Sequence, residues 1–348
     1  MRVAVLGAGR MGQMRAELLT RLPEVDDVVV GARDGASAEA LSDRLRGRVV
    51  PLADALSCRC DAVVVCVPTT SHSAVLRSAL AMGVPVFCEK PLTDDLGASE
   101  ALAGEFERAG RVLQMGYHRR FDPGFSAVRA AVGAGDVGTL YSITITALDH
   151  RLQGPGFLTN SGGIFRDLHV HDFDLARWVT GLEIEQVCAA ASVRADPRLS
   201  EVGDFDTTAI TAVLSGGVLL SVSGARHNPR GQDVRLEVHG SKDDVCAGLT
   251  SRLPLRPLDI GETLCGVDPY EDFMERFAPA FAAETAAFVD VVCGRRANPC
   301  PPEEDLAAFG VAVAADRSVR SGRVEPIHPI RRSAPDPLTV HVPERKDQ

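Results

Sequence analysis

The sequence begins with an apolar stretch that runs directly into a glycine-rich turn. Residues 2–12 read RVAVLGAGRMG, and helix-forming residues continue to Leu22. A strand, a GxGxxG turn and a helix in this order are typical of a dinucleotide-binding site. Gly7 permits the tight bend, Gly9 lets the backbone approach a pyrophosphate, and Gly12 lets the helix pack closely on the strand. We therefore predict NAD(P) as the cofactor, with its phosphates at the helix N-terminus.

Strand-like and helical stretches alternate over the first third of the chain. The expected strands are 28–31, 62–67, 84–88 and 112–115, and the expected helices are 36–45, 72–82 and 94–109. This alternation predicts an α/β fold with a doubly wound parallel sheet, in which ligands bind beyond the carboxyl ends of the strands. The predicted cofactor-binding residues lie at those ends and in the glycine turn: Gly7, Gly9, Arg10, Met11, Gly12, Ala32, Arg33, Pro68, Thr69, His72, Glu89 and Lys90.

Lys90 stands between Glu89 and Pro91 at the end of one predicted strand. The proline disfavours helical geometry for the residue before it, so the lysine is expected to face the ligand crevice. A lysine at a strand end is also commonly a solvated surface charge. Both interpretations fit the local sequence.

The pattern changes beyond about Tyr117. The expected strands are 141–148, 187–193, 207–214, 218–223 and 234–239, and helices are expected at 277–292 and 303–319. Several of these strands alternate polar and apolar residues, which predicts a mostly antiparallel open sheet with one buried face. We predict a dinucleotide-binding domain at 1–118, a substrate and oligomerisation domain at 119–330, and a surface tail at 331–348.

The overall charge restricts the classes of partner. The formal net charge is -10, which argues against a general affinity for nucleic acid or for an anionic membrane. No apolar run approaches the roughly 18 residues of a membrane span. The nine cysteines include no CxxC pair, so reduced thiols and a cytoplasmic location are expected.

A polar segment in the second half carries the candidate acid–base groups. Residues 161–178 read SGGIFRDLHVHDFDLARW, with apolar residues mostly at helical spacing and Ser161 near the expected cap. Asp167, His171 and Asp174 fall at i, i+4 and i+7, which places them on one helix face. A carboxylate one turn from an imidazole can orient the ring and raise its basicity, as a general base requires. The alternative is a helix end with solvated charges.

The same segment is rich in metal-ligand residue types. His169 and His171 are two residues apart, however, and a helix directs them to roughly opposite sides. Phe173 also stands where the metallo-hydrolase pattern HxHxDH has its aspartate. We therefore predict that the site holds no metal.

Taken together, GAGRMG, EKP, GYHRRFDP and GG…D…H..D resemble the glucose-fructose oxidoreductase / inositol dehydrogenase (Gfo/Idh/MocA) family over nearly the whole chain. The resemblance implies a Rossmann domain and a second α/β domain whose open sheet packs against another subunit, as in a homodimer or homotetramer. It implies oxidation of a ring hydroxyl, or reduction of the ketone, with a nicotinamide cofactor. It also implies that Lys90, Asp167 and His171 are catalytic.

Within that family the second half is most similar to inositol 2-dehydrogenases. Where they often carry HRN, this chain has His150-Arg151-Leu152, and where they often carry GYD it has Gly231-Gln232-Asp233. These departures put myo-inositol itself in question and leave a modified cyclitol open, such as an aminocyclitol precursor in antibiotic biosynthesis. The substrate-binding residues that the resemblance implies are Arg119, His150, Asp174 and Gln232.

Alternatives of other classes remain at this point. A sugar or nucleotide-sugar dehydrogenase, a glycosidase that does not consume NAD, and a non-catalytic dinucleotide-binding regulator all occur on related scaffolds. For the cofactor, Ala32 occupies the place where an acidic residue normally binds the ribose 2′-hydroxyl, and Arg33 follows it. This favours NADP, whereas Asp34 two positions on could restore NAD.

Overall fold

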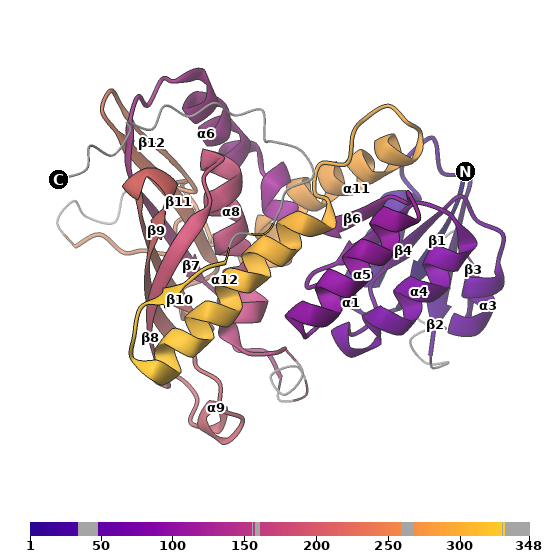
Figure 1. Ribbon diagram of the computed structural model, residues 1–348, viewed down its shortest axis with the longest axis horizontal. Helices are drawn as coiled ribbons and strands as arrows, with labels where there is room; N and C mark the ends of the chain where they lie inside the picture. The colour runs from indigo at the N-terminus through magenta and orange to yellow at the C-terminus, as the bar shows by residue number, and fades with distance from the viewer. Residues whose placement is uncertain (34–47, 155, 157–160, 259–266, 329, 331–348) are drawn as a thin grey trace. The chain divides into compact units, whose positions relative to one another are not determined.

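The computed structural model describes residues 1–33, 48–154, 156, 161–258, 267–328 and 330. The chain divides into two compact units, each described here by itself (Figure 1). The first contains Met1–His118 and Phe281–Leu306, and the second contains Arg119–Ala280 and the chain from Ala307 onward. The predicted helix at 36–45 and the predicted tail at 331–348 lie outside the described residues.

The first unit is built on a parallel sheet of six described strands, in the order β3-β2-β1-β4-β5-β6. Every neighbouring pair is parallel, and the order reverses at β1, which confirms the predicted doubly wound sheet. The strands are β1 (Arg2–Leu6), β2 (Asp27–Ala32), β3 (Arg48–Pro51), β4 (Ala62–Val65), β5 (Val86–Glu89) and β6 (Leu113–Gly116). The helices are α1 (Arg10–Leu19), α3 (Leu52–Ser57), α4 (His72–Met82) and α5 (Leu96–Arg108).

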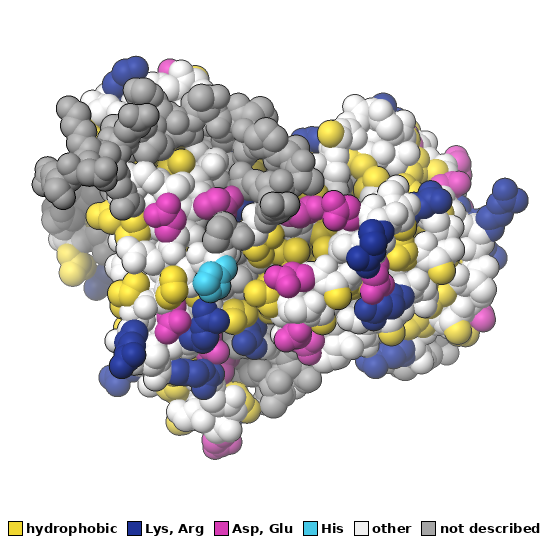
Figure 2. Space-filling model, in the orientation of Figure 1, with side chains coloured by type: hydrophobic (Ala, Val, Ile, Leu, Met, Phe, Trp, Pro, Cys, Tyr) yellow, Lys and Arg dark blue, Asp and Glu magenta, His cyan; other side chains and the backbone are white. Residues whose placement is uncertain are grey.

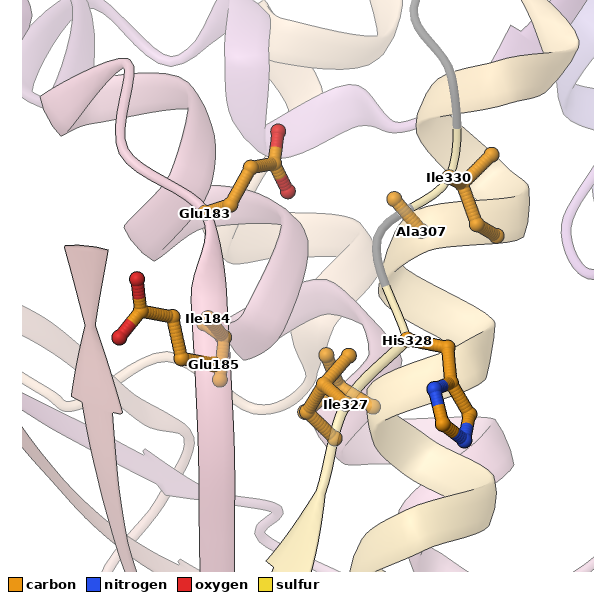
Figure 3. Close-up of a pocket in the computed structure, with 8 residues that line it drawn as sticks. Glu183, Ile184, Glu185, Ala307, Ile327, His328 and Ile330 are labelled. Atoms are coloured by element: carbon orange, nitrogen blue, oxygen red, sulfur yellow. The ribbon is translucent and has the colours of Figure 1, made fainter.

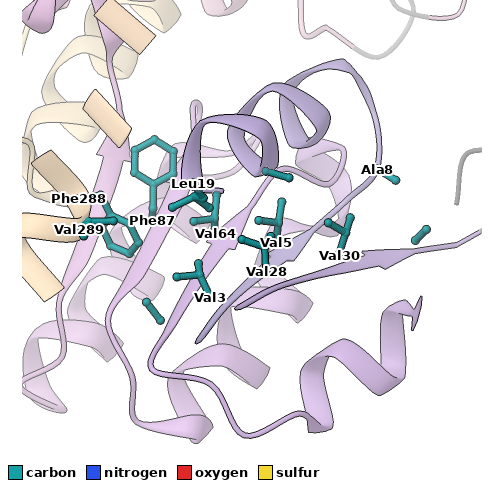
Figure 4. Close-up of a cluster of buried hydrophobic side chains, with 13 residues drawn as sticks. Val3, Val5, Ala8, Leu19, Val28, Val30, Val64, Phe87, Phe288 and Val289 are labelled. Atoms are coloured by element: carbon teal, nitrogen blue, oxygen red, sulfur yellow. The ribbon is translucent and has the colours of Figure 1, made fainter. Parts of the chain in front are cut away.

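A continuous apolar cluster lies on one face of this sheet (Figure 4). Valines of β1, β2 and β4 form its centre, because parallel strands covered on both faces bury every side chain. Phe288 and Val289 of helix α11 (Ala278–Val292) join the same cluster. The predicted division kept 119–330 together, but residues 281–306 return to the first unit because these apolar side chains complete its core.

The second unit contains a mixed sheet in the order β12-β11-β7-β10-β9-β8-β13. Its neighbouring strands are antiparallel except for β7 and β10, so the expectation of a mostly antiparallel sheet is confirmed. The strands are β7 (Leu140–Leu148), β8 (Ile184–Ser192), β9 (Thr207–Leu214), β10 (Leu219–Ala225), β11 (Asp233–Gly240), β12 (Asp244–Ala247) and β13 (Glu325–Pro326). Helices α6 (Pro123–Ala134), α8 (Val170–Thr180) and the later part of α12 (Pro302–Ser321) cover one face of this sheet (Figure 1).

Helix α6 was not predicted, although its start carries a clear signal. The Asp122 carboxylate caps it by accepting hydrogen bonds from the backbone N–H groups of Gly124 (3.0 Å) and Phe125 (3.1 Å). Pro123 occupies the first helical position, where its missing N–H costs nothing. An Asp-Pro pair before a run of small apolar residues therefore specified this helix.

On the face that Figure 2 shows, acidic and basic side chains are intermixed, and the basic ones form no single continuous patch. None of the helices in the described residues combines the length and the apolar character needed to cross a bilayer.

Candidate active site

The glycine turn has the geometry that a dinucleotide requires. Gly7 has φ +113°, and a Cβ built on it would lie 2.6 Å from the carbonyl oxygen of Cys66. A Cβ on Gly12 would lie 1.8 Å from the carbonyl oxygen of Gly7, whereas a Cβ on Gly9 would meet nothing within 4 Å. Helix α1 begins after Gly9 without a side-chain cap, so its first N–H groups face the open space there. This cradle fits a pyrophosphate, and the residues present therefore fit NAD(P).

The other predicted cofactor residues follow the ends of β2, β4 and β5. Ala32 is buried, whereas Arg33 beside it is exposed. Asp34, the residue that could restore NAD, lies outside the described residues. Pro68 and Thr69 lie just beyond β4, where a short 3-10 turn leads into α4.

His72, at the start of α4, has a buried ring that lies between two strand ends. Its Nδ1 lies 3.0 Å from the carbonyl oxygen of Pro91, and its Nε2 lies 2.9 Å from that of Val67. The ring thus ties the loop after β4 to the turn after Lys90. These two contacts give the buried ring partners within the protein. Direct contact of His72 with a cofactor stays a prediction.

In the second unit the candidate catalytic segment is not a regular α-helix throughout. A π-helical turn spans Phe165–His169, and α8 continues from Val170. The expected Ser161 cap is replaced by Asp204, whose Oδ1 accepts a hydrogen bond from the N–H of Ile164 at 2.8 Å. Ser161 instead accepts a long bond, 3.3 Å, from the N–H of Gly163. A distant loop therefore fixes where this helix begins.

Asp167 is held by a buried arginine that sequence spacing did not reveal. Arg226 donates from Nη1 to Oδ2 of Asp167 at 3.0 Å, and its Nη2 lies 3.0 Å from Oδ2 of Asp204. Burial alone would lower the pKa of Arg226, but the two carboxylates outweigh it and raise that pKa. The guanidinium is therefore a permanent positive charge beside Asp167. His171, on α8, is 8% exposed.

Two further arginine–carboxylate pairs anchor α8. Arg120 binds Asp174 through both ends of its guanidinium, with Nε at 2.9 Å from Oδ2, and both side chains are buried. Arg119 pairs with the buried Asp172. The Asp172 carboxylate also accepts from Nδ1 of His169 at 2.7 Å. Burial would raise the pKa of Asp172, but Arg119 and His169 outweigh it and lower that pKa.

These pairs give Arg119 and Asp174 partners within the protein. Their buried, charge-matched contacts account for both side chains without a substrate. Their predicted role in substrate binding stays a prediction. His169 is fully buried, and its Nε2 lies 2.7 Å from Oγ1 of Thr208, so both ring nitrogens are bound by protein groups.

Gln232, one of the two positions where the chain departs from the inositol dehydrogenase pattern, contacts the chain just after β7. The Gln232 amide nitrogen donates to Oδ1 of Asp149 at 2.8 Å, and its oxygen accepts from the N–H of His150 at 3.4 Å. Gln232 therefore binds the chain just after β7 at two points. Its contact with a substrate stays a prediction. Asp149, which the sequence analysis missed, has a pKa raised by burial.

His150 has a defined tautomer when its ring is neutral. Its Nδ1 lies 2.8 Å from the carbonyl oxygen of Glu271, which can only accept. Nδ1 must then carry the proton, which leaves Nε2 as a hydrogen-bond acceptor. A substrate hydroxyl is a suitable donor to such a nitrogen.

A pocket of about 140 Å³ in the second unit lies apart from all of these residues (Figure 3). It forms where the segment after β13 runs beside β8 and α12, with the N–H of Ile327 bound to the carbonyl oxygen of Glu185 at 2.8 Å. Figure 3 shows the carboxylates of Glu183 and Glu185 directed away from Ile327. Its lining residues are Glu183, Ile184, Glu185, Ala307, Val311, Ile327, His328 and Ile330. It contains none of the predicted site residues.

The fold and the glycine cradle define a two-domain, nicotinamide-dependent oxidoreductase. Residues 1–117 match the model of the oxidoreductase family with an NAD-binding Rossmann fold, and residues 125–245 match that of the GFO/IDH/MocA C-terminal domain. The chain belongs to the GFO/IDH/MocA family of oxidoreductases.

Relatives with inositol dehydrogenase names cover nearly the whole chain. Myo-inositol dehydrogenase Hyg17 of Streptomyces leeuwenhoekii is 36% identical over 94% of this chain and 100% of its own length. Inositol 2-dehydrogenase of Rhizobium meliloti (strain 1021) is 34% identical over 92% and 98%.

Solved structures show the same architecture. The scyllo-inositol dehydrogenase of Lactobacillus casei with bound NAD(H) and scyllo-inositol superposes with a TM-score of 0.83 at 26% identity, covering 94% of this chain and 98% of that one. GenD2 from gentamicin A biosynthesis, in complex with NAD, superposes with a TM-score of 0.81 at 25% identity, covering 94% and 97%.

The network beneath α8 depends on the absence of a side chain at Gly224 in β10. A Cβ built there would lie 2.1 Å from Cε1 of His169 and 2.7 Å from Oγ1 of Thr208. We predict that Gly224→Ala lowers the free energy of unfolding by about 1–3 kcal/mol, because the fully buried His169 has no space to retreat. Urea unfolding measures the effect.

Gly310→Ala in α12 is the matched control, because a Cβ there meets nothing within 4 Å. It should leave the unfolding free energy unchanged or raise it by about 0.5–1 kcal/mol. Equal stability of the Gly224 variant and this control would contradict the packing argument.

Proposed function

We propose that this protein is an NAD(P)-dependent dehydrogenase that oxidises a ring hydroxyl of a cyclitol to the ketone. The observation that carries the proposal is the general-base candidate His171, which follows Asp167 on one helical segment, where the buried Arg226 holds Asp167. The glycine turn of the same chain fits a dinucleotide. The names of the relatives support a cyclitol as the substrate class.

The proposed roles follow from the chemistry of each side chain. His171 takes the proton from the reacting hydroxyl, and Asp167 orients its ring and balances the positive charge that develops. Lys90 hydrogen-bonds the reacting oxygen and stabilises negative charge on it. His150 accepts a hydrogen bond from a neighbouring hydroxyl through Nε2. The bound nicotinamide supplies the hydride acceptor.

Removing the proposed base tests this assignment. His171→Ala should lower kcat by at least about 10²-fold, since positioned acid–base groups contribute about 10²–10⁴-fold. Cofactor affinity should stay within the wild-type range, because the glycine turn belongs to the other unit. Steady-state turnover and a cofactor titration measure the two quantities. Near-normal turnover in this variant would refute the assigned role of His171.

The substrate we propose is an inositol or an aminocyclitol, the latter in antibiotic biosynthesis. Leu152 and Gln232 replace the residues of the inositol dehydrogenase pattern, and GenD2 from gentamicin A biosynthesis shares the fold. A sugar or nucleotide sugar is the second candidate. Absorbance at 340 nm with a panel of cyclitols, aminocyclitols and free sugars should show reduced cofactor accumulating with a cyclitol. Product formed without net reduction would indicate a glycosidase, and cofactor binding without any product would indicate a regulator.

We further propose that NADP is the preferred cofactor, with NAD also used. Ala32 leaves no carboxylate to repel a 2′-phosphate, and the exposed Arg33 can grip one with two hydrogen bonds. Arg33→Ala should lower kcat/KM for NADP by about tenfold, equivalent to about 1.4 kcal/mol, and change the NAD value little. Arg21→Ala, an exposed arginine after α1, is the control. A tenfold preference of the wild type for NAD, unchanged in the Arg33 variant, would contradict the proposal.

Finally, we propose that the protein is a homodimer or homotetramer formed through the open face of the second sheet. That face presents small polar residues of β9 and β10, flanked by Tyr141 and Leu219, which are 57% and 55% exposed. Ser221→Arg in the middle of β10 should break the assembly, whereas Ser78→Arg at an exposed position of α4 should not. Light scattering at micromolar concentration measures the mass of the assembly. A wild-type mass near 37.0 kDa, that of one chain, would contradict an oligomer.

A further inference from the structure

Three charged side chains lie together beneath the end of β5, and the proposed mechanism uses none of them directly. Arg15 of α1 donates from Nε to Oε1 of Glu89 at 2.9 Å, and its Nη2 lies 2.8 Å from the same oxygen. The other side of its guanidinium binds Glu284 and, at 2.9 Å, the hydroxyl of Thr285, both on α11. Arg15 is 1% exposed and Glu284 is fully buried. All of these residues belong to the first unit.

Two aromatic rings and a backbone carbonyl group also contact the guanidinium of Arg15. Its guanidinium carbon lies 4.6 Å from the ring centroid of Phe87 and 5.3 Å from that of Phe281, and Nη1 also donates to the carbonyl oxygen of Phe281 at 3.3 Å. A guanidinium with five directional donors and two aromatic neighbours has one orientation. Gly116 leaves room for the carboxylate, because a Cβ there would lie 2.9 Å from Oε2 of Glu89.

The chain is anchored again just beyond Lys90. His72 lies against the carbonyl oxygens of Pro91 (3.0 Å) and Leu92 (3.2 Å). The N–H of Leu92 donates to Oδ2 of Asp305 at 3.1 Å. Lys90 therefore stands between an upstream anchor at Glu89 and a downstream anchor at Pro91 and Leu92.

We propose that Arg15 and Glu284 are positioning residues that hold the Glu89 carboxylate and thereby set the side-chain direction and the electrostatic surroundings of Lys90. Lys90 follows Glu89 directly, in the bend just beyond β5, so a Glu89 tied to α1 and α11 fixes the backbone from which the Lys90 side chain departs. The inference rests on the proposed function only in giving Lys90 its catalytic role.

The charge of this cluster changes near neutral pH. Burial raises the pKa of Glu284 to about 7, against the pull of Arg15, and Glu89 adds to the rise. The groups that face Glu284 are Arg15 from α1, Glu89 from β5, the thiol of Cys66 after β4 and the backbone of Tyr117 after β6. With Glu284 neutral the formal charges of Arg15 and Glu89 cancel, and with Glu284 ionised one negative charge is left over. Glu89, which directly precedes Lys90 in the chain, belongs to this cluster.

Glu284→Gln tests this arrangement, because glutamine keeps an acceptor for Arg15 and loses the charge. Asp290→Asn is the matched control: it removes the same charge from the same helix at an exposed position paired with Arg295. The first readout is the acylation of Lys90 by acetic anhydride between pH 6 and pH 10, followed by mass spectrometry on the full-length protein. Only the free amine reacts, and no substrate or turnover is needed.

We expect Lys90 in the Glu284 variant to react at least about threefold faster at pH 8 than in the wild type, because a lower negative charge favours the free amine. The Asp290 control should match the wild type. A Lys90 profile that is the same in both variants would overturn the inference. Protein stability is an independent readout. Because the pKa of Glu284 is higher in the folded protein (about 7) than in the unfolded chain (4.5), its contribution to the unfolding free energy is fully present below pH 4.5. That contribution is lost as the pH rises through about 7. The fall in unfolding free energy between pH 5 and pH 8 should therefore be smaller in Glu284→Gln.

Turnover separates this inference from the proposed function. With a cyclitol that the wild type oxidises, Arg15→Met should lower kcat by at least about tenfold, and Arg15→Lys should restore part of it while KM for the cofactor stays within about twofold. Equal losses in kcat and cofactor binding would indicate a merely structural arginine and count against positioning. If the wild type oxidises no cyclitol, the proposed function fails, and the Lys90 labelling still decides the present inference.

Discussion

A guanidinium buried between two carboxylates holds the helix that carries His171. Arg226 reaches Asp167 in the π-helical turn and Asp204 in the loop that caps that turn. The positive charge of Arg226 offsets the repulsion between these two carboxylates, since like charges at short range disfavour joint ionisation. The position of Asp167, the start of the helix and the direction of α8 therefore depend on one side chain at the end of β10.

Buried arginine–carboxylate pairs also occur elsewhere in the described chain. Arg120 holds Asp174, Arg119 holds Asp172, and Arg15 holds Glu89 together with Glu284. Each pair joins segments far apart in sequence and lies in a nearly water-free environment. A buried pair of this kind adds little net stability over an apolar contact, but loss of one partner is costly. These pairs therefore specify geometry more than they contribute stability, which suits the proton transfer that we propose for His171.

Gln232, at a position that departs from the family pattern, has partners within the protein. Gln232 does not project freely, because Asp149 and the backbone of His150 bind both ends of its amide. The glutamine stiffens the end of β7, where the His150 ring is also fixed by the carbonyl oxygen of Glu271. Selection among cyclitols, as we propose the function, would then depend on the rigid His150 and on the shape left by Leu152.

The sequence by itself determined the local features: the strand–glycine–helix turn, the alternation that produces a doubly wound sheet, and the polarity pattern of the second sheet. Each depends on neighbours within about 20 residues, so composition and periodicity are sufficient to reveal it. The sequence also placed Asp167 and His171 on one helical segment. Only the tertiary structure decided that Arg226 and Asp204 support that segment, that α11 completes the first core, and that Asp174 and Gln232 have protein partners. The hydrogen-bonded side chains among them lie up to 83 positions apart, and charge complementarity at such separation leaves no periodic pattern in the sequence.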